Sequence, residues 1–340
     1  MKIRIRHICR IFVATIIFFG GSEGLVADQA KQTPLAAIPI AIVNNRVLVK
    51  VSVGHHQVSL TLDTGASNSA LFQSRDHDFS DLGVLGDANI IFPALDEVVH
   101  GVNLVPVPIR FGTYTYNPTR LLRVDRRPPV GDRLNFKFDG VLGQDFFNEF
   151  VVEIDREAMS LNLYKAGTDL SDYFRTELQL VMKGTAPHIK LQNKMPWENH
   201  IRTKELMLDT GYPGAMVLWG NKHFLLAARG NNIDTLRAEN KGIFTLANFK
   251  IGMLRFFRTP IFVAPQEPIQ AVERDGIIGS NILIWFHHVI DFPGKRLLLD
   301  IGSIHFNRMD NGYYLPNNEN FLVKRFDPKP PVGSIYVLDN

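Results

Sequence analysis

The chain has 340 residues, with 37 lysine and arginine residues against 34 aspartate and glutamate residues and a formal net charge of +3. Residues 1–27 hold four of the basic and one of the acidic residues, so the other 313 residues (340 − 27) carry 33 of each sign (37 − 4 and 34 − 1). This balance gives no reason to expect nucleic acid or an anionic membrane surface as a partner. A stretch of 313 residues is long enough for two packed domains.

The first 27 residues have the layout of a secretory signal peptide. A basic start, from Lys2 to Arg10, precedes a short apolar segment over 11–20, and small and polar residues then lead to a possible cleavage point after Ala27. The apolar segment is short for a membrane-spanning helix. We therefore expect residues 1–27 to direct export and to leave no stable membrane span after cleavage. The alternative is a leader that is retained as an anchor.

The rest of the chain contains neither a cysteine nor a site for N-linked glycosylation. The one cysteine, Cys9, lies inside the predicted leader, and the segment Asn117–Thr119 has proline at its central position. An exported protein without disulfides or glycosylation sites favours a periplasmic location, with secretion as the wider alternative.

Apolar and alternating runs, separated by turn residues, predict a mostly β structure in a first domain over 38–166. Asn44 and Asn45 stand between two such runs, which is the pattern of a β-hairpin with a tight turn. A second hairpin is expected around Gly112, and a short helix over 144–149. The strands are expected over 38–43, 46–53, 58–62, 104–111, 114–124 and 151–163.

A similar pattern returns in a second domain over 177–305, after a polar stretch over 167–176 that we interpret as a linker. Its strands are expected to start near Leu178, over 205–208 and over 297–301, with short helices over 223–229 and 281–286. The tail over 306–340 is polar and contains a proline-rich, extended run, followed by a possible last strand over 334–338.

The triplet Asp-Thr-Gly occurs twice in this chain, at 63–65 and at 209–211. Each copy follows a short apolar run. Each is also followed, further along, by the pattern Asp-Gly-apolar-apolar-Gly, at 139–143 and at 275–279. One such triplet alone would be weak evidence, but two copies with matching partners make a strong signal.

The repeat extends beyond these motifs. The two aspartates of the triplets are 146 residues apart (209 − 63), Gly112 and Gly252 are 140 apart, and the glycine-rich patterns are 136 apart (275 − 139). The segments 139–155 and 275–291 correspond throughout with the constant offset of 136. Three segments in the same order predict an internal duplication, with shorter loops in the second copy.

Two nearby carboxyl groups suit the hydrolysis of a peptide bond without a metal or a covalent intermediate. One carboxylate can take a proton from water while a carboxylic acid gives a proton to the carbonyl oxygen. Two close carboxyl groups cannot both ionise cheaply, so the pair keeps one shared proton and titrates as a unit. Glycine after Asp-Thr allows a tight turn and a close approach of the two loops.

These residues resemble the motifs of the aspartic proteases, both the single-chain pepsin type and the dimeric retropepsin type. Leu62–Ala66 matches the retropepsin form of the motif, and Phe138–Gly143 is similar to the pepsin form of the glycine strand. The resemblance implies an all-β, bilobal, pepsin-like fold, with two duplicated β-barrel-like lobes and a cleft between them. It implies an aspartic endopeptidase that acts on a peptide or protein substrate without a cofactor.

The resemblance also assigns roles to single residues. It implies that Asp63 and Asp209 are the catalytic pair and that the two loops are locked together by Thr64, Gly65, Thr210 and Gly211. Because both copies lie in one chain, we expect an intramolecular active site and a monomer. The alternatives are a peptide-binding or regulatory protein that keeps the fold without turnover, and lobes that each pair with another chain.

Two positions depart from the pepsin pattern, which usually has serine or threonine after the triplet. Here these positions hold Ala66 and Tyr212, which are also candidates for contact with substrate. Without the hydroxyl hydrogen bond, the carboxyl pair should be less acidic, so we expect activity at mildly acidic to neutral pH. Flap hairpins are expected over 90–105 and 236–246, with the side chains of Phe92, His100 and Phe244 as candidates to touch substrate.

Two pairs of adjacent histidines, at 55–56 and 287–288, raise the question of a metal site. Neighbouring side chains on a strand point to opposite faces, so we expect ordinary surface or core histidines and no metal. Asp139 and Asp275 precede glycine in the repeated pattern and are expected to be structural, as are the matched residues Asp155 and Asp291.

Overall fold

The computed structural model describes residues 32–74, 76–92, 97–126, 138–194, 200–220, 235–239, 242–252, 254–265, 275–284, 286–300, 307–309, 312–314 and 334–337. The chain divides into two compact units, Met1–Gln32 and Thr33–Asn340. Gln32 is the one described residue of the first unit. The predicted signal peptide and the predicted helix over 223–229 therefore lie outside the described residues. Among the described helices, none has the length and apolarity needed to cross a membrane.

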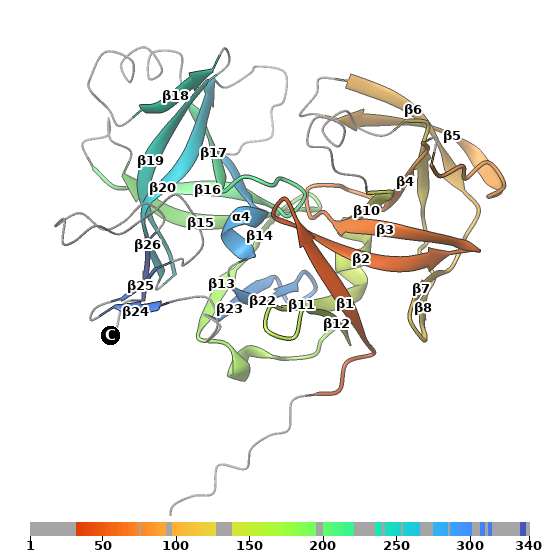
Figure 1. The fold of residues 1–340 in the computed structure, drawn as a ribbon, viewed down its shortest axis with the longest axis horizontal. Helices are drawn as coiled ribbons and strands as arrows, with labels where there is room; N and C mark the ends of the chain where they lie inside the picture. Colours follow the sequence, from red (N-terminus) through yellow and green to blue (C-terminus); the bar gives the residue numbers. More distant parts are fainter. Residues whose placement is uncertain are drawn as a thin grey trace, which may run out of the picture. The chain divides into compact units, whose positions relative to one another are not determined.

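The described part of the first half contains strands and one α-helix, and most of the strands carry their labels in Figure 1. The elements are β1 Ala36–Val43, β2 Arg46–Val53, β3 His56–Leu62, β4 Ala70–Phe72, β5 Val84–Phe92, β6 Glu97–Leu104, β7 Ile109–Phe111, β8 Tyr114–Tyr116, β9 Leu122–Val124, β10 Gly140–Leu142, α2 Gln144–Glu149, β11 Phe150–Asp155 and β12 Ser160–Lys165.

The second half repeats this plan after a short 3-10 turn at Ser171–Tyr173. The elements are β13 Thr176–Gln179, β14 Val181–Lys183, β15 Ala186–Lys194, β16 Arg202–Asp209, β17 Met216–Gly220, β18 Thr235–Glu239, β19 Gly242–Ile251, β20 Leu254–Pro265, β21 Gly276–Gly279, α4 Ser280–Leu283, β22 His287–Asp291, β23 Arg296–Asp300, β24 Asn307–Met309, β25 Gly312–Tyr314 and β26 Ser334–Val337. The prediction of an all-β fold is confirmed.

Local turn chemistry explains the first hairpin. Asn44 and Asn45 have positive φ angles of 47° and 64°, as a two-residue hairpin turn with matching twist requires, and asparagine tolerates this conformation better than most residues. The strands on either side pair from Ile40↔Val49 to Val43↔Arg46, as predicted.

The second predicted hairpin is only partly correct. The turn at Gly112 has a φ of 61° and joins β7 to β8, but these two strands span three residues each. The rest of the predicted segment 104–124 contains a loop over 105–108 and the separate strand β9. Pro106, Pro108 and Pro118 interrupt the run, because proline cannot donate to a strand ladder.

Hydrogen-bonded strands form two large sheets in the described part of the chain. A 15-stranded sheet has the order β13-β23-β22-β11-β12-β1-β2-β3-β10-β4-β9-β6-β5, with β7 and β8 attached to β2. An 11-stranded sheet has the order β18-β19-β15-β16-β21-β17-β20-β26-β25-β24, with β14 attached to β15. Strands from both halves of the chain therefore share the first sheet.

The pairing of β11 with β22 obeys the internal repeat. Val152 pairs with Ile290 and Ile154 pairs with His288. With the repeat offset of 136, Val152 corresponds to His288 and Ile154 corresponds to Ile290. The repeat therefore exchanges these two residue pairs and leaves the register unchanged. The two halves thus meet through equivalent strands, as expected for a duplicated chain with a local two-fold axis.

A buried acidic residue lies at the centre of this pairing. Glu153 has no exposed surface and pairs with Val289. Its carboxylate accepts hydrogen bonds from Asn162 Nδ2 at 2.9 Å and Tyr164 Oη at 2.7 Å, and it contacts His287 Nε2 at 2.6 Å. These partners satisfy a charge that would otherwise be costly to bury.

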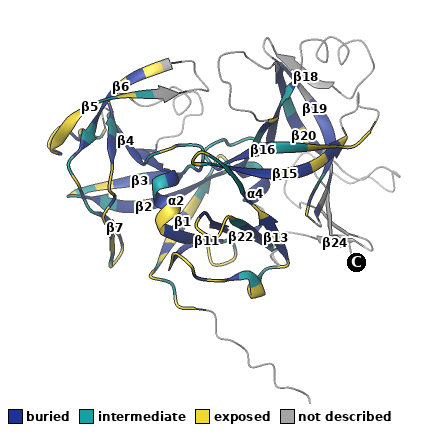
Figure 2. Ribbon diagram, turned by 180° about the vertical axis from the view of Figure 1, so that it is seen from behind, coloured by how far each residue is buried: buried dark blue, intermediate teal, exposed yellow. Residues whose placement is uncertain are grey.

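Buried side chains from both halves belong to one hydrophobic cluster. Helix α2 contributes Phe146 and Phe147, and the Phe147 ring lies 5.3 Å from the ring of Phe292 in the second half. Figure 2 shows β11 and β22 among the buried elements, whereas much of β5 is exposed. The junction of the two halves is therefore part of the core.

The predicted tail contributes to the second sheet. Strand β26 matches the predicted last strand and pairs with β20, from Leu254↔Val337 to Phe257↔Ser334. Tyr313 of β25 pairs with Ile335 of β26. The described parts of the segment over 306–340 thus extend the sheet of the second half.

Candidate active site

The two Asp-Thr-Gly triplets lie in equivalent places, each at the end of a strand. Asp63 follows β3 and Asp209 is the last residue of β16. Each of these strands pairs in parallel with the strand of its own glycine pattern, with Leu62 opposite Leu142 and Leu208 opposite Ile278. The apolar residues before each aspartate are buried, so the core holds both loops at their bases.

Reciprocal hydrogen bonds join the two loops through their threonines. The Thr64 N–H donates to Thr210 Oγ1 and the Thr210 N–H donates to Thr64 Oγ1, both at 3.0 Å. The Thr64 hydroxyl donates to the Leu208 carbonyl at 2.7 Å, and the Thr210 hydroxyl donates to the Leu62 carbonyl at 2.9 Å. Thr64 is fully buried and Thr210 nearly so, so the network is shielded from water.

The glycines of the triplets let each loop approach the carboxyl group of the other. A Cβ atom on Gly65 would lie 2.7 Å from Asp209 Cγ, and a Cβ atom on Gly211 would collide with the Asp63 carboxyl group. The two carboxyl groups are themselves within hydrogen-bond reach of each other. Sequence segments 146 residues apart are therefore brought to a single pair of carboxyl groups.

The surroundings of Asp63 favour a retained proton. Burial raises the pKa of the Asp63 carboxyl group above its ordinary value. The N–H groups of Gly65 and Ala66 donate to Asp63 Oδ1 at 2.9 Å and 3.1 Å and oppose this rise by stabilising the carboxylate. The positive charge of Arg46 and the hydrogen bond with Asp209 act in the same lowering direction, but burial dominates.

The positions after the triplets contribute backbone groups. Ala66 donates its N–H to Asp63, and Tyr212 donates its N–H to Asp209 Oδ1 at 3.0 Å. The Ala66 side chain packs against an apolar cluster, and burial raises the pKa of the Tyr212 phenol. The raised pKa of Asp63 has the direction that is expected for a less acidic carboxyl pair. The role of Ala66 and Tyr212 in substrate contact stays a prediction.

Each loop is also supported by the helix that follows its glycine pattern. Gln144 donates its backbone N–H to the Ala66 carbonyl at 2.8 Å and its side-chain amide to the Thr64 carbonyl at 2.8 Å. In the second half, Ser280 donates its backbone N–H and its hydroxyl to the Tyr212 carbonyl, at 2.9 Å and 3.0 Å. The support is equivalent in position but differs in side-chain chemistry.

Asp139 and Asp275 have matching contacts with the strands that lead to the triplets. The Asp139 carboxylate accepts the Ser59 N–H at 2.8 Å, and the Asp275 carboxylate accepts the Glu205 N–H at 2.7 Å. Asp155 and Asp291 each accept backbone N–H groups in the turn that follows them, and Asp291 also pairs with Arg296 at 2.9 Å. The structural interpretation of these four aspartates agrees with their contacts.

An arginine that the sequence did not single out lies beside the carboxyl pair. Arg46 is only 4% exposed, and its Nε donates to the Gly211 carbonyl at 2.8 Å. The neighbouring Asn45 donates its side-chain amide to the Pro213 carbonyl at 3.0 Å. The β1–β2 turn of the first half is thus attached to the second triplet loop.

The charge of Arg46 interacts with both aspartates, while burial lowers the pKa of its guanidinium. Its Nη1 has no hydrogen-bond partner among the described residues, and the guanidinium lies 5.8 Å from the centre of the Phe138 ring. Arginine keeps its charge even when buried, so Arg46 places a permanent positive charge near the pair.

The segments predicted as flaps overlap two hairpins, β5–β6 and β18–β19. The side chains of Phe92 and Phe244 lie outside the described residues. His100 pairs with Asp125 and, at 3.6 Å, with Asp87, and the hydrogen bond with Asp125 raises the pKa of the His100 imidazole. Contact of His100 with substrate stays a prediction.

The expectation that His55 and His56 point to opposite faces is wrong. Gly54 and His55 form the turn between β2 and β3, so only His56 lies on a strand. The two rings lie 4.1 Å apart at 31°, and both contact Asp81. At the other pair, His287 contacts Glu153 whereas Nδ1 of the buried His288 lies 3.0 Å from the Phe286 carbonyl oxygen.

The threonine network predicts a stability effect. Thr210→Val keeps the shape of the side chain but removes the acceptor of the buried Thr64 N–H. We expect a loss of about 2 kcal/mol in the free energy of unfolding, since a buried N–H without a partner is costly. Urea unfolding measures this loss. Thr61→Val is the matched control, because the Thr61 hydroxyl donates to Val47 within the first half only. Equal losses in both variants would contradict a special role of the network.

No protein-family model matches the sequence, and no curated protein matches it. The crystal structure of an aspartic proteinase from Irpex lacteus is similar, with a TM-score of 0.52 and 16% sequence identity. The match covers 79% of this chain and 97% of that chain. At this identity the likeness concerns the fold, and it shows that this chain has the fold of an aspartic proteinase.

Proposed function

We propose that this protein is an aspartic endopeptidase in which Asp63 and Asp209 activate a water molecule between them. The observation that carries the proposal is the reciprocal threonine network, which joins two loops of one chain and brings their carboxyl groups together. A similar fold in a known aspartic proteinase supports the same class of reaction. The site would be complete within a monomer.

The chemistry follows from the shared proton of the pair. The ionised carboxylate takes a proton from water as the water oxygen attacks the peptide carbonyl carbon, and the protonated carboxyl group gives its proton to the carbonyl oxygen. The tetrahedral intermediate then collapses as the amide nitrogen is protonated and the C–N bond breaks. Burial supports this role by favouring a retained proton on Asp63.

We further propose that the protein acts outside the cytoplasm, in a periplasm or as a secreted enzyme. The layout of residues 1–27 supports this location. The balanced charge of the remaining chain fits a peptide or protein substrate without a polyanionic partner.

A mixed peptide library incubated with the purified chain between about pH 3 and pH 8 tests the proposal, with mass spectrometry to identify products. We expect internal cleavage of peptides, with the highest rate at mildly acidic to neutral pH. Peptides that are retained by the protein but stay intact over the whole pH range would favour the alternative, a binding protein without turnover. A rate that peaks well below about pH 4 would contradict the less acidic pair.

A further inference from the structure

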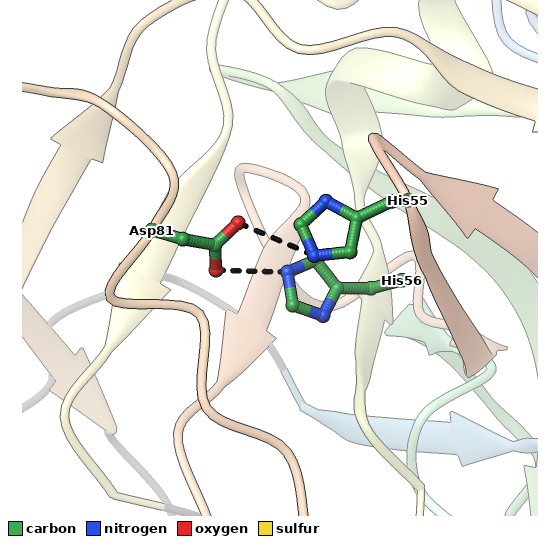
Figure 3. A group of neighbouring side chains, drawn as sticks. All are labelled: His55, His56 and Asp81. Carbon is green, nitrogen blue, oxygen red and sulfur yellow. Dashed lines mark hydrogen bonds and ion pairs between the residues drawn. The ribbon is translucent and has the colours of Figure 1, made fainter.

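We propose that His55, His56 and Asp81 form a binding site for a divalent transition-metal ion of the zinc class. The three side chains converge at the β2–β3 turn, as Figure 3 shows. His56 Nε2 lies 2.9 Å from Asp81 Oδ1, and His55 Nε2 lies 3.6 Å from Asp81 Oδ2. One ligand atom from each residue can be chosen so that all three lie within 4.8 Å of one another.

These separations suit a common metal ion. Zinc binds imidazole nitrogen and carboxylate oxygen at about 2.0–2.2 Å, which places tetrahedral ligand atoms about 3.3 Å apart. The distances of 2.9 Å and 3.6 Å lie on either side of this value, so small side-chain rotations bring the donors to an ion. Two imidazoles and one carboxylate favour zinc-class ions over magnesium or calcium, which prefer oxygen ligands.

The backbone holds the ligands in place. Gly54 has a φ of 59°, which sets the tight turn that brings His55 beside His56. The turn is fixed by the pairing of Val53 with His56. Two ligands from adjacent positions can therefore face one carboxylate, which they could not do along a regular strand.

The core anchors both segments that supply ligands, the β2–β3 turn and the turn that contains Asp81. The His56 ring packs edge-on against Phe79, with ring centres 5.0 Å apart, and Phe79 is fully buried. Leu82 closes the turn that contains Asp81 by donating its N–H to the Phe79 carbonyl at 3.2 Å. Both protein segments that supply ligands thus contact the same buried ring or its backbone, which limits their relative motion.

The site is open to solvent on one side. His55 is 76% exposed, Asp81 is 42% exposed and His56 is 15% exposed as side chains. An ion can enter without a change of fold and can keep water at its remaining positions. Strand β3 separates this turn from Asp63 by about 20 Å, so the site is independent of the proposed hydrolysis. A bound ion would cross-link the β2–β3 turn to the loop that carries Asp81.

Calorimetric titration of the full chain, prepared without a histidine tag, with zinc chloride at about pH 7.5 tests the proposal. We expect one zinc ion per chain at this site, no heat of binding with magnesium, and a midpoint of thermal unfolding that rises by a few degrees with zinc. Cobalt in place of zinc should give the visible absorption of a low-symmetry site with nitrogen and oxygen ligands. The Asp63→Asn variant should bind zinc equally well, so the result does not depend on peptidase activity.

Substitutions locate the site. His56→Ala and Asp81→Asn should each weaken zinc binding at least about tenfold. His55→Gln should also weaken it, and this side chain is exposed enough that folding is not at risk. His200→Ala, which removes an exposed histidine in the second half, is the control and should change nothing. Absence of zinc binding, wild-type affinity in His55→Gln, or an equal loss in His200→Ala would overturn the proposal.

Discussion

Replacing Asp63 with asparagine is expected to lower kcat/KM for peptide cleavage by on the order of 10⁴-fold, and Asp209→Asn should do the same. Asparagine fits the same space but can neither share the proton nor act as a base, so both proton transfers of the proposed reaction are lost. The two losses should not add in the double variant, because the pair acts as one unit. Steady-state rates on a peptide identified from the library measure the effect.

The same variant should keep its fold. Because burial raises the pKa of Asp63, the folded protein loses stability as the pH rises from the unfolded-state pKa of this carboxyl group through its folded-state pKa. Below the unfolded-state value the acid is neutral in both states and this cost is absent. Asp63→Asn should therefore unfold at a temperature equal to or above that of the wild type near pH 7. Asp87→Asn is the control, since that side chain is 87% exposed and its ion pair with His100 lies at the surface. Full activity in Asp63→Asn would exclude the proposed dyad.

The parts of the fold that sequence predicted are those with a local or repeated signal. The turn at Asn44 and Asn45 needs only the tolerance of asparagine for positive φ. The offset of 136 predicted equivalent segments, and the pairing Val152↔Ile290 has the symmetry that this offset requires. Helix α2 has the bounds that were expected from its place after the glycine pattern, and it buries Phe146 and Phe147.

The parts that sequence did not predict depend on contacts between distant segments. In the sequence, Arg46 is an ordinary strand residue. Its role depends on the fold, which places Gly211 beside it from 165 positions further along the chain. The pairing of His55 and His56 was missed because alternation along a strand was applied to a turn residue. The loop over 105–108 interrupts the predicted hairpin because two prolines remove ladder donors.

The hydrogen bonds that join the two halves at the carboxyl pair satisfy polar groups of the triplet loops. Threonine hydroxyls satisfy the buried N–H groups of both triplets, and Arg46 satisfies the Gly211 carbonyl from the opposite half. Each of these bonds joins the first half to the second. The geometry of the carboxyl pair therefore depends on the junction of the halves. Burial raises the pKa of Asp63, whereas the N–H groups of Gly65 and Ala66 and the charge of Arg46 lower it.

This balance leads to a second large effect, in the variant Arg46→Met. The positive charge of Arg46 lowers the pKa of Asp63 and so opposes the effect of burial. Removing it should raise the pKa values of the pair, and the pair would then take up and lose its shared proton at higher pH. We expect both limbs of the pH–rate profile to move upward by about one unit. At the wild-type optimum, kcat/KM should fall on the order of 10- to 100-fold, since the pair would be over-protonated and the Gly211 carbonyl would lose its donor.

The variant Arg46→Lys separates charge from hydrogen bonding, because it keeps the positive charge but lacks the Nε donor in its fixed geometry. The limbs of its pH–rate profile should stay near those of the wild type, while its kcat/KM falls. Arg123→Met is the matched control, since the Arg123 guanidinium donates to the Phe79 carbonyl and to neither triplet loop. Carbon-13 resonances of the aspartate carboxyl groups report the pKa values of the pair directly, even in a variant with little activity. Removing a buried charge beside two carboxyl groups must shift the pKa values of those groups. If the titration curves of Asp63 and Asp209 are identical in the wild type and in Arg46→Met, Arg46 acts only by packing.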